Sequence, residues 1–478
     1  MTAIRFDPRQ ELANPAQMSR HSSAAPDRAS TLSFWLLLAF LAILWVSGGA
    51  SRADVLGQAF VRSSAWLIIV VAILALPRVD WRAVREPAIV LGAAALLLIF
   101  QSVPLPPAIW TELPGRAIFN EAAILAGVDQ PWRPLSISPS GTSNALASLV
   151  VPTAVLLLAG NLTREQHWRV AVFVLFLAGA GAVLGVLQFS GAKFGNPLIN
   201  SVTGAVAGNF ANRNHFALFL AVGCVLALAW AFREKAGLWK TGTAFGLLVI
   251  FVLMILATGS RSGVVVGLLG IMLALLAFRE EIARKFRILH RRYSVALIIL
   301  AIVAVIGVIW LSIYLERAAS VERATLLEGE SDLRLQIWPI VLDMTRAYFP
   351  VGTGFGTFDP AYRIGEPDSQ LNTHYVNLAH NDWLQVVLEG GVLGLVLLAA
   401  SFLWFGLRSF NAWCVPDNRP GSCSLARTGS IVIVLILTAS ITDYPARTPM
   451  VMALLALAAI WLMKGKSKGR ISLIPESG

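Results

Sequence analysis

The chain has 478 residues, of which 56% are hydrophobic and only 14% are charged, and its formal net charge is +11. A soluble globular protein could not cover so much apolar surface, so the composition excludes that class and predicts an all-α polytopic membrane protein. The basic residues are dispersed over alternate loops and form no single patch, which argues against nucleic-acid binding and favours contact with membrane lipids.

About twelve apolar runs approach the length of about 20 residues that an α-helix needs to cross a bilayer. They are Leu32–Gly49, Ser63–Leu76, Ala88–Leu105, Asn144–Gly160, Val170–Phe189, Phe216–Phe232, Thr243–Thr258, Gly263–Phe278, Val295–Tyr314, Leu384–Leu407, Gly429–Thr442 and Thr448–Met463. Several runs are short, so the expected number carries a margin of about one or two helices.

Basic residues occur in every second connection, as the positive-inside bias requires of cytoplasmic loops. This alternation predicts that residues 1–31 form a cytoplasmic tail and residues 32–314 a bundle of about nine helices. Residues 315–383 would be a large periplasmic loop containing short helices, residues 384–463 about three further helices, and residues 464–478 a basic cytoplasmic tail. Both termini are therefore expected on the cytoplasmic side of the membrane.

Polar residues crowd the start of the apolar run at Phe216, where Arg213, Asn214 and His215 stand together. Asparagines at a solvated helix start are ordinary capping residues. Capping does not explain an arginine and a histidine at the same membrane entrance. This cluster is therefore also a candidate for binding a polar substrate.

Arg261 interrupts the apolar stretch from Thr243 to Phe278, which is too long for one span, so the chain must reverse there. An interfacial arginine that extends its guanidinium to water is one interpretation. The alternative is a guanidinium at the mouth of the bundle that forms bidentate hydrogen bonds to phosphate.

Apolar residues at helical spacing predict an amphipathic helix between Ser331 and Tyr348, with Arg334 on another face and Pro339 as a kink. The glycine-rich run from Gly352 to Gly356 follows it. No strand is predicted before this run, so it is interpreted as a plain turn and not as a nucleotide-binding loop.

The strongest constellation begins at His380 and continues through Asn381, Asp382, Gln385 and Glu389. A helix starting near Asp382 would place Asn381, Gln385 and Glu389 roughly on one face, with Asp382 near the positive end of the helix dipole. Glu389 would lie about 10 Å along the axis, deep enough to need a partner. His380, just outside the helix, could act as a general base or as a structural cap. Asn381, Asp382, Gln385 and Glu389 are candidates for binding substrate.

The segments GNFANRNHFA, TGSRSG, RLQIW with VGTGFGTF, and HNDWLQVVLEGGVLG together resemble the O-antigen ligase and polymerase superfamily of bacterial envelopes, mainly between Asn144 and Gly394. The resemblance implies a multi-pass protein of the bacterial inner membrane. It implies glycosyl transfer, at the periplasmic face, from an undecaprenyl-diphosphate-linked glycan to lipid A core or to a growing polysaccharide. It implies that Arg213, Arg261 and Arg334 bind the diphosphate, that His380 deprotonates the acceptor, and that His374 assists.

Two guanidinium groups can neutralise a leaving diphosphate without a metal, and the first outer loop has only Asp54 as a carboxylate. We therefore expect no metal and no cofactor. The motifs do not separate a ligase from a polymerase of O-antigen or exopolysaccharide. A secondary transporter is the third hypothesis. Two features argue against it: the large outer loop has no counterpart in the first half of the chain, and charged residues are scarce in the middle of the spans.

Overall fold

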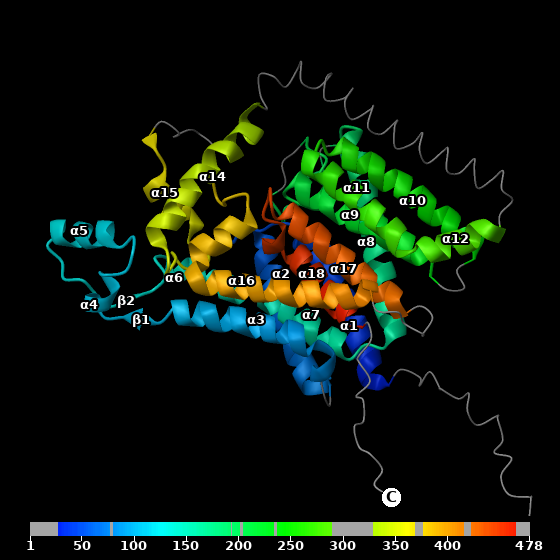
Figure 1. The fold of residues 1–478 in the computed structure, drawn as a ribbon, viewed down its shortest axis with the longest axis horizontal. Coiled ribbons are helices and arrows are strands. Elements are labelled where there is room, and N and C mark those ends of the chain that lie inside the picture. Colours follow the sequence, from blue (N-terminus) through cyan, green and yellow to red (C-terminus); the bar gives the residue numbers. More distant parts are fainter. Residues whose placement is uncertain are drawn as a thin grey trace, which may run out of the picture.

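The computed structural model describes residues 27–76, 80–192, 194–200, 204–233, 237–288, 328–368, 376–414 and 422–464. Within these ranges the chain is almost wholly helical (Figure 1). The two strands, β1 (Pro104–Leu105) and β2 (Arg133–Pro134), form a short antiparallel ribbon. The all-α class predicted from composition is confirmed.

Eight helices in the described part of the chain are long and apolar enough to cross a membrane. They are α1 (Arg28–Ser47), α2 (Leu56–Ala75), α3 (Trp81–Gln101), the run formed by α6 (Pro139–Ser148) and α7 (Val150–Gly160), α8 (Arg164–Phe189), α9 (Arg213–Ala231), α10 (Leu238–Ala257) and α16 (Asp382–Cys414). Three shorter apolar helices accompany them: α11 (Arg261–Ala277), α17 (Ser422–Ala439) and α18 (Pro449–Met463).

Eleven of the apolar runs named from the sequence thus lie on described helices, while the run Val295–Tyr314 lies outside the described residues. The number of about twelve spans stays a prediction. The second run, which looked short from the sequence, belongs to a helix of 20 residues because α2 begins at Leu56 and includes the polar residues Gln58 and Arg62.

Helix α9 is the centre of the bundle, with α8, α10, α11 and α17 packed around it. In the most apolar 18-residue stretch of α9, 89% is buried inside the protein. Small residues permit this close packing: an added Cβ on Gly223 would meet the Phe251 ring and the Ala178 side chain. Helix α18 packs against α17 and α7, also contacts α1, α3 and α16, and is buried along most of its length.

Two parts outside the spanning helices lie at one end of the bundle, while α12 (Arg279–Ile288) lies at the other end (Figure 1). One is the segment with β1, α4 (Pro107–Trp110), α5 (Ala117–Leu125) and β2, and the other contains α14 (Glu328–Tyr348) and α15 (Phe358–Gly365). The buried Arg116 joins them, because its Nη2 donates to the carbonyls of Leu135 and Gly352. Burial lowers the pKa of Arg116 to about 10.

Helix α14 confirms the predicted amphipathic helix and continues through Pro339. Ile337, Val341, Met344 and Tyr348 form its buried face, as their spacing indicates. The side chain of Arg334 and the whole of His374 lie outside the part of the chain that is described. Their predicted places in the site therefore stay untested.

Helix α16 begins at Asp382, as predicted, and is kinked at Gly391, whose φ is 55° and ψ is −145°. The glycine-rich run after α14 packs against this kink and is a turn, as interpreted from the sequence. Thr353 N donates to Leu388 O at 3.0 Å, and Gly354 N donates to Glu389 O at 2.9 Å. The turn thus supports the first two turns of α16 from outside.

Candidate functional site

Asp443 lies at the centre of a polar cluster where α17 gives way to the short 3₁₀ helix η3 (Pro445–Arg447). Only 1% of Asp443 is exposed. Its Oδ2 accepts hydrogen bonds from the side-chain amides of Asn212 at 2.9 Å and Asn214 at 2.7 Å. Its Oδ1 accepts one from the backbone of Tyr444 at 3.0 Å. Asp443 therefore holds the start of α9 against the turn between α17 and α18.

Two histidines approach the same carboxylate. His215 Nε2 lies 3.7 Å and His380 Nδ1 lies 3.5 Å from Asp443 Oδ1. Burial raises the pKa of Asp443, but hydrogen bonds and charge from the two imidazoles outweigh it and hold that pKa well below its usual value. The carboxylate therefore stays ionised and can stabilise positive charge on either imidazole.

The histidines differ in how the protein holds them. His215 is 2% exposed, and its Nδ1 lies 2.9 Å from Thr448 Oγ1. The side chain of His380 is 22% exposed. The edges of both rings contact Tyr444, with centroid distances of 5.2 and 4.9 Å. His380 is thus the histidine of this pair with greater access to a ligand.

The backbone at His380 is in the left-handed region, with φ of 50°. Such a conformation costs a residue other than glycine about 1–3 kcal/mol and persists only where the surroundings impose it. The next residue, Asn381, caps α16 by accepting a hydrogen bond from Leu384 N at 3.0 Å. His380, with its strained backbone, therefore lies between the capped start of α16 and the side chain of Asp443.

Arg213 and Arg261 are the first residues of α9 and α11. Ser260, which caps α11, donates to Asn214 Oδ1 at 2.7 Å, so the two helix starts are joined directly. Arg213 is half-buried and Arg261 is exposed. Hydrogen bonds and contacts therefore run from Ser260 through Asn214 and Asp443 to His380, and they bring the predicted arginines and histidine to one end of the bundle.

The acidic residues of α16 have a partner that the sequence analysis did not single out. Arg447 Nε lies 3.2 Å from Asp382 Oδ1, and its Nη2 lies 3.1 Å from Glu389 Oε2. Burial lowers the pKa of Arg447, but the two carboxylates outweigh it and raise that pKa above its usual value. The expectation that Glu389 needs a partner is confirmed, and the partner is Arg447.

Gln385 completes this network. Its Nε2 donates to Glu389 Oε1 at 3.0 Å and its Oε1 accepts from Ala379 N at 3.0 Å. Gln385 and Glu389 are both 0% exposed. Asp382, Gln385 and Glu389 were expected to bind substrate directly, whereas the structure gives their polar groups partners within the protein. They hold Arg447 and the segment that carries His380.

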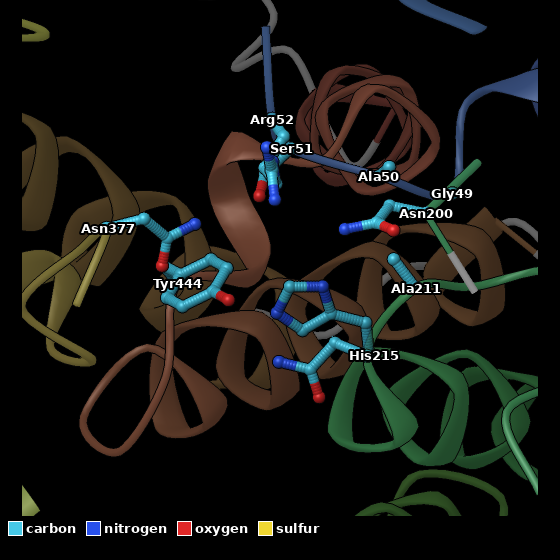
Figure 2. Close-up of a pocket in the computed structure, with 10 residues that line it drawn as sticks. Gly49, Ala50, Ser51, Arg52, Asn200, Ala211, His215, Asn377 and Tyr444 are labelled. Atoms are coloured by element: carbon cyan, nitrogen blue, oxygen red, sulfur yellow. The ribbon is translucent and has the colours of Figure 1, made fainter. Parts of the chain in front are cut away.

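A cavity of about 260 Å³ has His215 in its lining, and we call it the His215 cavity. Figure 2 shows His215 and Tyr444 side by side in it, with Arg52 and Asn377 nearby. Asn212, next to Arg213, also lines it. Among the described residues, Arg213, Arg261 and His380 are not part of its lining, although Arg213 adjoins Asn212 in the chain and His380 contacts Tyr444.

Asp443, Tyr444 and Arg447 were missed because the turn between the last two apolar runs was treated only as a connection. A signal was present: this turn of a few residues contains an acid, an aromatic residue and an arginine. By the alternation of spans it also falls on the same side as His380. The tertiary contacts could not be read from the sequence, because Asp443 is more than 220 residues from Asn212.

Residues 246–399 match the family model described as O-antigen ligase. No curated protein matches the chain. The matched segment contains Arg261 and His380, whereas Arg213 and Asp443 lie outside it. Several apolar helices together with this match indicate a multi-pass bacterial membrane protein. Over this segment, which carries Arg261 and His380, the match supports the resemblance to the O-antigen ligase-like superfamily.

Proposed function

We propose that the protein transfers a glycan from undecaprenyl diphosphate to an acceptor such as lipid A core, at the periplasmic face of the inner membrane and without a metal. The observation that carries the proposal is the placement of His380 against the ionised Asp443, at the same end of the bundle as Arg213 and Arg261. The family match supports the general class of reaction.

In the proposed reaction His380 removes the proton of an acceptor hydroxyl, and the oxygen attacks the anomeric carbon of the donor glycan. A new glycosidic C–O bond forms while the bond between that carbon and the phosphate oxygen breaks. The electron pair leaves with undecaprenyl diphosphate. Asp443 lies at Nδ1 of the imidazole, so it stabilises the imidazolium that forms when Nε2 takes the proton.

Arg213 and Arg261 provide charge for the leaving diphosphate. Each is the first residue of a long helix, where backbone N–H groups and the helix dipole also favour anions. A guanidinium can bind two phosphate oxygens through parallel hydrogen bonds. Two such groups at adjacent helix starts would stabilise the charge that develops as the bond breaks.

The test is transfer by the purified, full-length protein from a defined undecaprenyl-diphosphate glycan to purified lipid A core. We expect His380→Ala to lower the rate by about 10²-fold or more, the usual contribution of a general base. Arg213→Lys and Arg261→Lys should keep little of the parent's transfer rate, because an ammonium group cannot form the two parallel hydrogen bonds of a guanidinium. The control is Arg346→Lys, a change at an exposed arginine paired with Asp343 on α14, which should leave the rate unchanged. Near-normal product from His380→Ala would refute the proposal.

A deletion strain distinguishes the ligase from the polymerase that uses the same donor. Loss of a ligase should leave bare core together with long polymer on its lipid carrier. Loss of a polymerase should leave core that bears at most one repeat unit. The second pattern would assign the protein to chain extension and overturn the choice of acceptor.

A further inference from the structure

A second cavity, of about 380 Å³, adjoins the His215 cavity, and we call it the Arg62 cavity. Both cavities have Ser51, Arg52 and Asn377 in their lining, so they are neighbouring parts of one hollow. Figure 2 shows these three residues at the edge of the His215 cavity. The Arg62 cavity extends from there between α2, α6 and the start of α18.

Three arginines line the Arg62 cavity, and two of them have acidic partners. Arg52 is paired with Asp54, and Arg447 is paired with the two carboxylates of α16. For Arg62 the structure shows no acidic partner among the described residues. Its Nε is buried and has no hydrogen-bond partner there. Arg62 therefore gives this cavity an uncompensated positive charge.

Arg62 lies within a helix that is apolar enough to cross the membrane, where a charged side chain is unusual. It is the seventh residue of α2, a helix that is long and apolar enough to cross the membrane, and lies about 9 Å along the axis from its start. An arginine within a span is costly and is usually retained to face a polar cavity or a ligand. A side chain that only extended into bulk water would not have a buried Nε. Arg62 instead lines a partly open cavity that other polar residues share.

The rest of the lining suits a sugar. Asn144 and Asn377 contribute side-chain amides, and Ser148 contributes a hydroxyl. Amides can both donate to and accept from sugar hydroxyls, while a guanidinium prefers a carboxylate or a phosphate. The volume falls in the range of about 300–1,000 Å³ that is usual for small-molecule sites.

We propose that the Arg62 cavity is the acceptor subsite and that it binds a sugar bearing an oxyanion, either a carboxylate or a phosphate. Arg62 binds the oxyanion, and the amides of Asn144 and Asn377 bind sugar hydroxyls. The inference rests on the proposed function, in which the donor diphosphate occupies the side of Arg213 and Arg261. The acceptor then approaches from the Arg62 cavity.

Direct binding tests the subsite without turnover. The purified full chain in detergent is titrated with methyl glucuronide, glucose 6-phosphate and neutral methyl glucoside. We expect at least one anionic sugar to bind at least tenfold more tightly than the neutral one, and the two anionic probes distinguish a carboxylate from a phosphate. Arg62→Gln should weaken that binding about tenfold or more, and Arg62→Lys should weaken it less. Arg346→Gln should bind as the parent does.

Two results would overturn the subsite: equal binding of the anionic sugars by Arg62→Gln and the parent, or equal binding of neutral and anionic sugars by the parent. Thermal unfolding of each variant verifies that it is folded, and Arg62→Lys serves as the second variant if Arg62→Gln is not. In the transfer assay Arg62→Gln should raise the KM for an anionic acceptor and leave the KM for the donor unchanged. A raised donor KM would instead assign the cavity to the donor and refute the inference.

The two proposals can fail separately. If His380→Ala abolishes transfer but Arg62→Gln changes neither sugar binding nor the acceptor KM, the acceptor subsite is wrong and the glycosyl transfer stands. If the parent protein binds anionic sugars through Arg62 but transfers no glycan, the glycosyl transfer is wrong and the anion site stands.

Discussion

Asp443 is the residue on which the candidate site depends. It accepts hydrogen bonds from two asparagines of α9 and approaches two histidines that are 165 residues apart in the chain (380 − 215 = 165). A carboxylate in this position can fix the orientation of an imidazole and stabilise its charged form. Asp443 is therefore a positioning residue for His380 and makes no direct contact with substrate in this proposal.

Asp443→Asn tests this role. The asparagine has nearly the same shape, so the protein should insert and accumulate, but the negative charge beside His380 is lost. We expect kcat for glycan transfer to fall about 10²-fold or more while the KM for donor and acceptor changes little. A purely structural role would instead lower the amount of folded protein and leave kcat of the remainder intact. Steady-state kinetics on the purified variant distinguishes the two.

The depressed pKa of Asp443 also predicts a pH dependence. A carboxyl group whose folded-state pKa is below its unfolded value stabilises the fold above the unfolded value, here the ordinary 3.8. That stabilisation is lost as the pH falls through the lower folded value. Thermal unfolding in detergent should therefore show a smaller loss of stability below about pH 4 for Asp443→Asn than for the parent.

At the scale of elements, two sets of interactions hold the start of α16. Arg447 binds Asp382 and Glu389 from the turn before α18, and the glycine-rich turn after α14 donates backbone hydrogen bonds to Leu388 and Glu389. The backbone hydrogen bonds from the glycine-rich turn require its backbone to approach the backbone of α16 closely. At Gly391 an added Cβ would overlap the carbonyl oxygen of Pro350, in addition to the strain of a φ of 55°.

Gly391→Ala should therefore destabilise the protein by about 1–3 kcal/mol or more, since alanine rarely adopts this backbone conformation. Gly406→Ala is the matched control on the same helix, because no atom lies within 4 Å of the added Cβ. That change should be neutral or stabilise the helix by about 0.5–1 kcal/mol. Thermal unfolding in detergent compares them, and equal midpoints would show that the kink is not required.

The same element shows what the sequence could predict locally. The start of α16 at Asp382 and the need of Glu389 for a partner both followed from helix geometry and burial in an apolar run. The identity of that partner did not follow, because Arg447 is 58 residues beyond Glu389. Likewise, the kink at Gly391 could not be separated from ordinary small-residue packing until the turn against it was known.

At the scale of the whole molecule, the charged and strained residues of the site gather at one end of the bundle. The basic connections fall at the other end, where Arg408 is paired with Glu86 and α16 ends at Cys414. The positive-inside bias then predicts that the basic end faces the cytoplasm and that the site faces the periplasm. The structure alone contains no membrane, so the orientation stays a prediction.

Cysteine labelling tests the orientation. Cys414 is exposed and Cys224 is buried, so in a Cys423→Ser background Cys414 is the described thiol that is open to reagents. A membrane-impermeant maleimide should label Cys414 only after the cells are permeabilised. Asp54→Cys, placed in the exposed connection between α1 and α2, should be labelled in intact spheroplasts. The reverse pattern would place the site in the cytoplasm and exclude a periplasmic transfer reaction.

The sequence by itself determined the class of the protein, because a chain with this much apolar surface is stable only in a bilayer, where each helix satisfies its own backbone hydrogen bonds. It also determined most helix positions and the candidates Arg213, Arg261 and His380, since polar residues that gather at the mouth of an apolar bundle indicate a polar substrate. Only the tertiary structure decided that Asp443 joins two of these segments and that Arg447 partners the acids of α16. Those contacts link residues far apart in the chain, and their partners depend on how the helices pack.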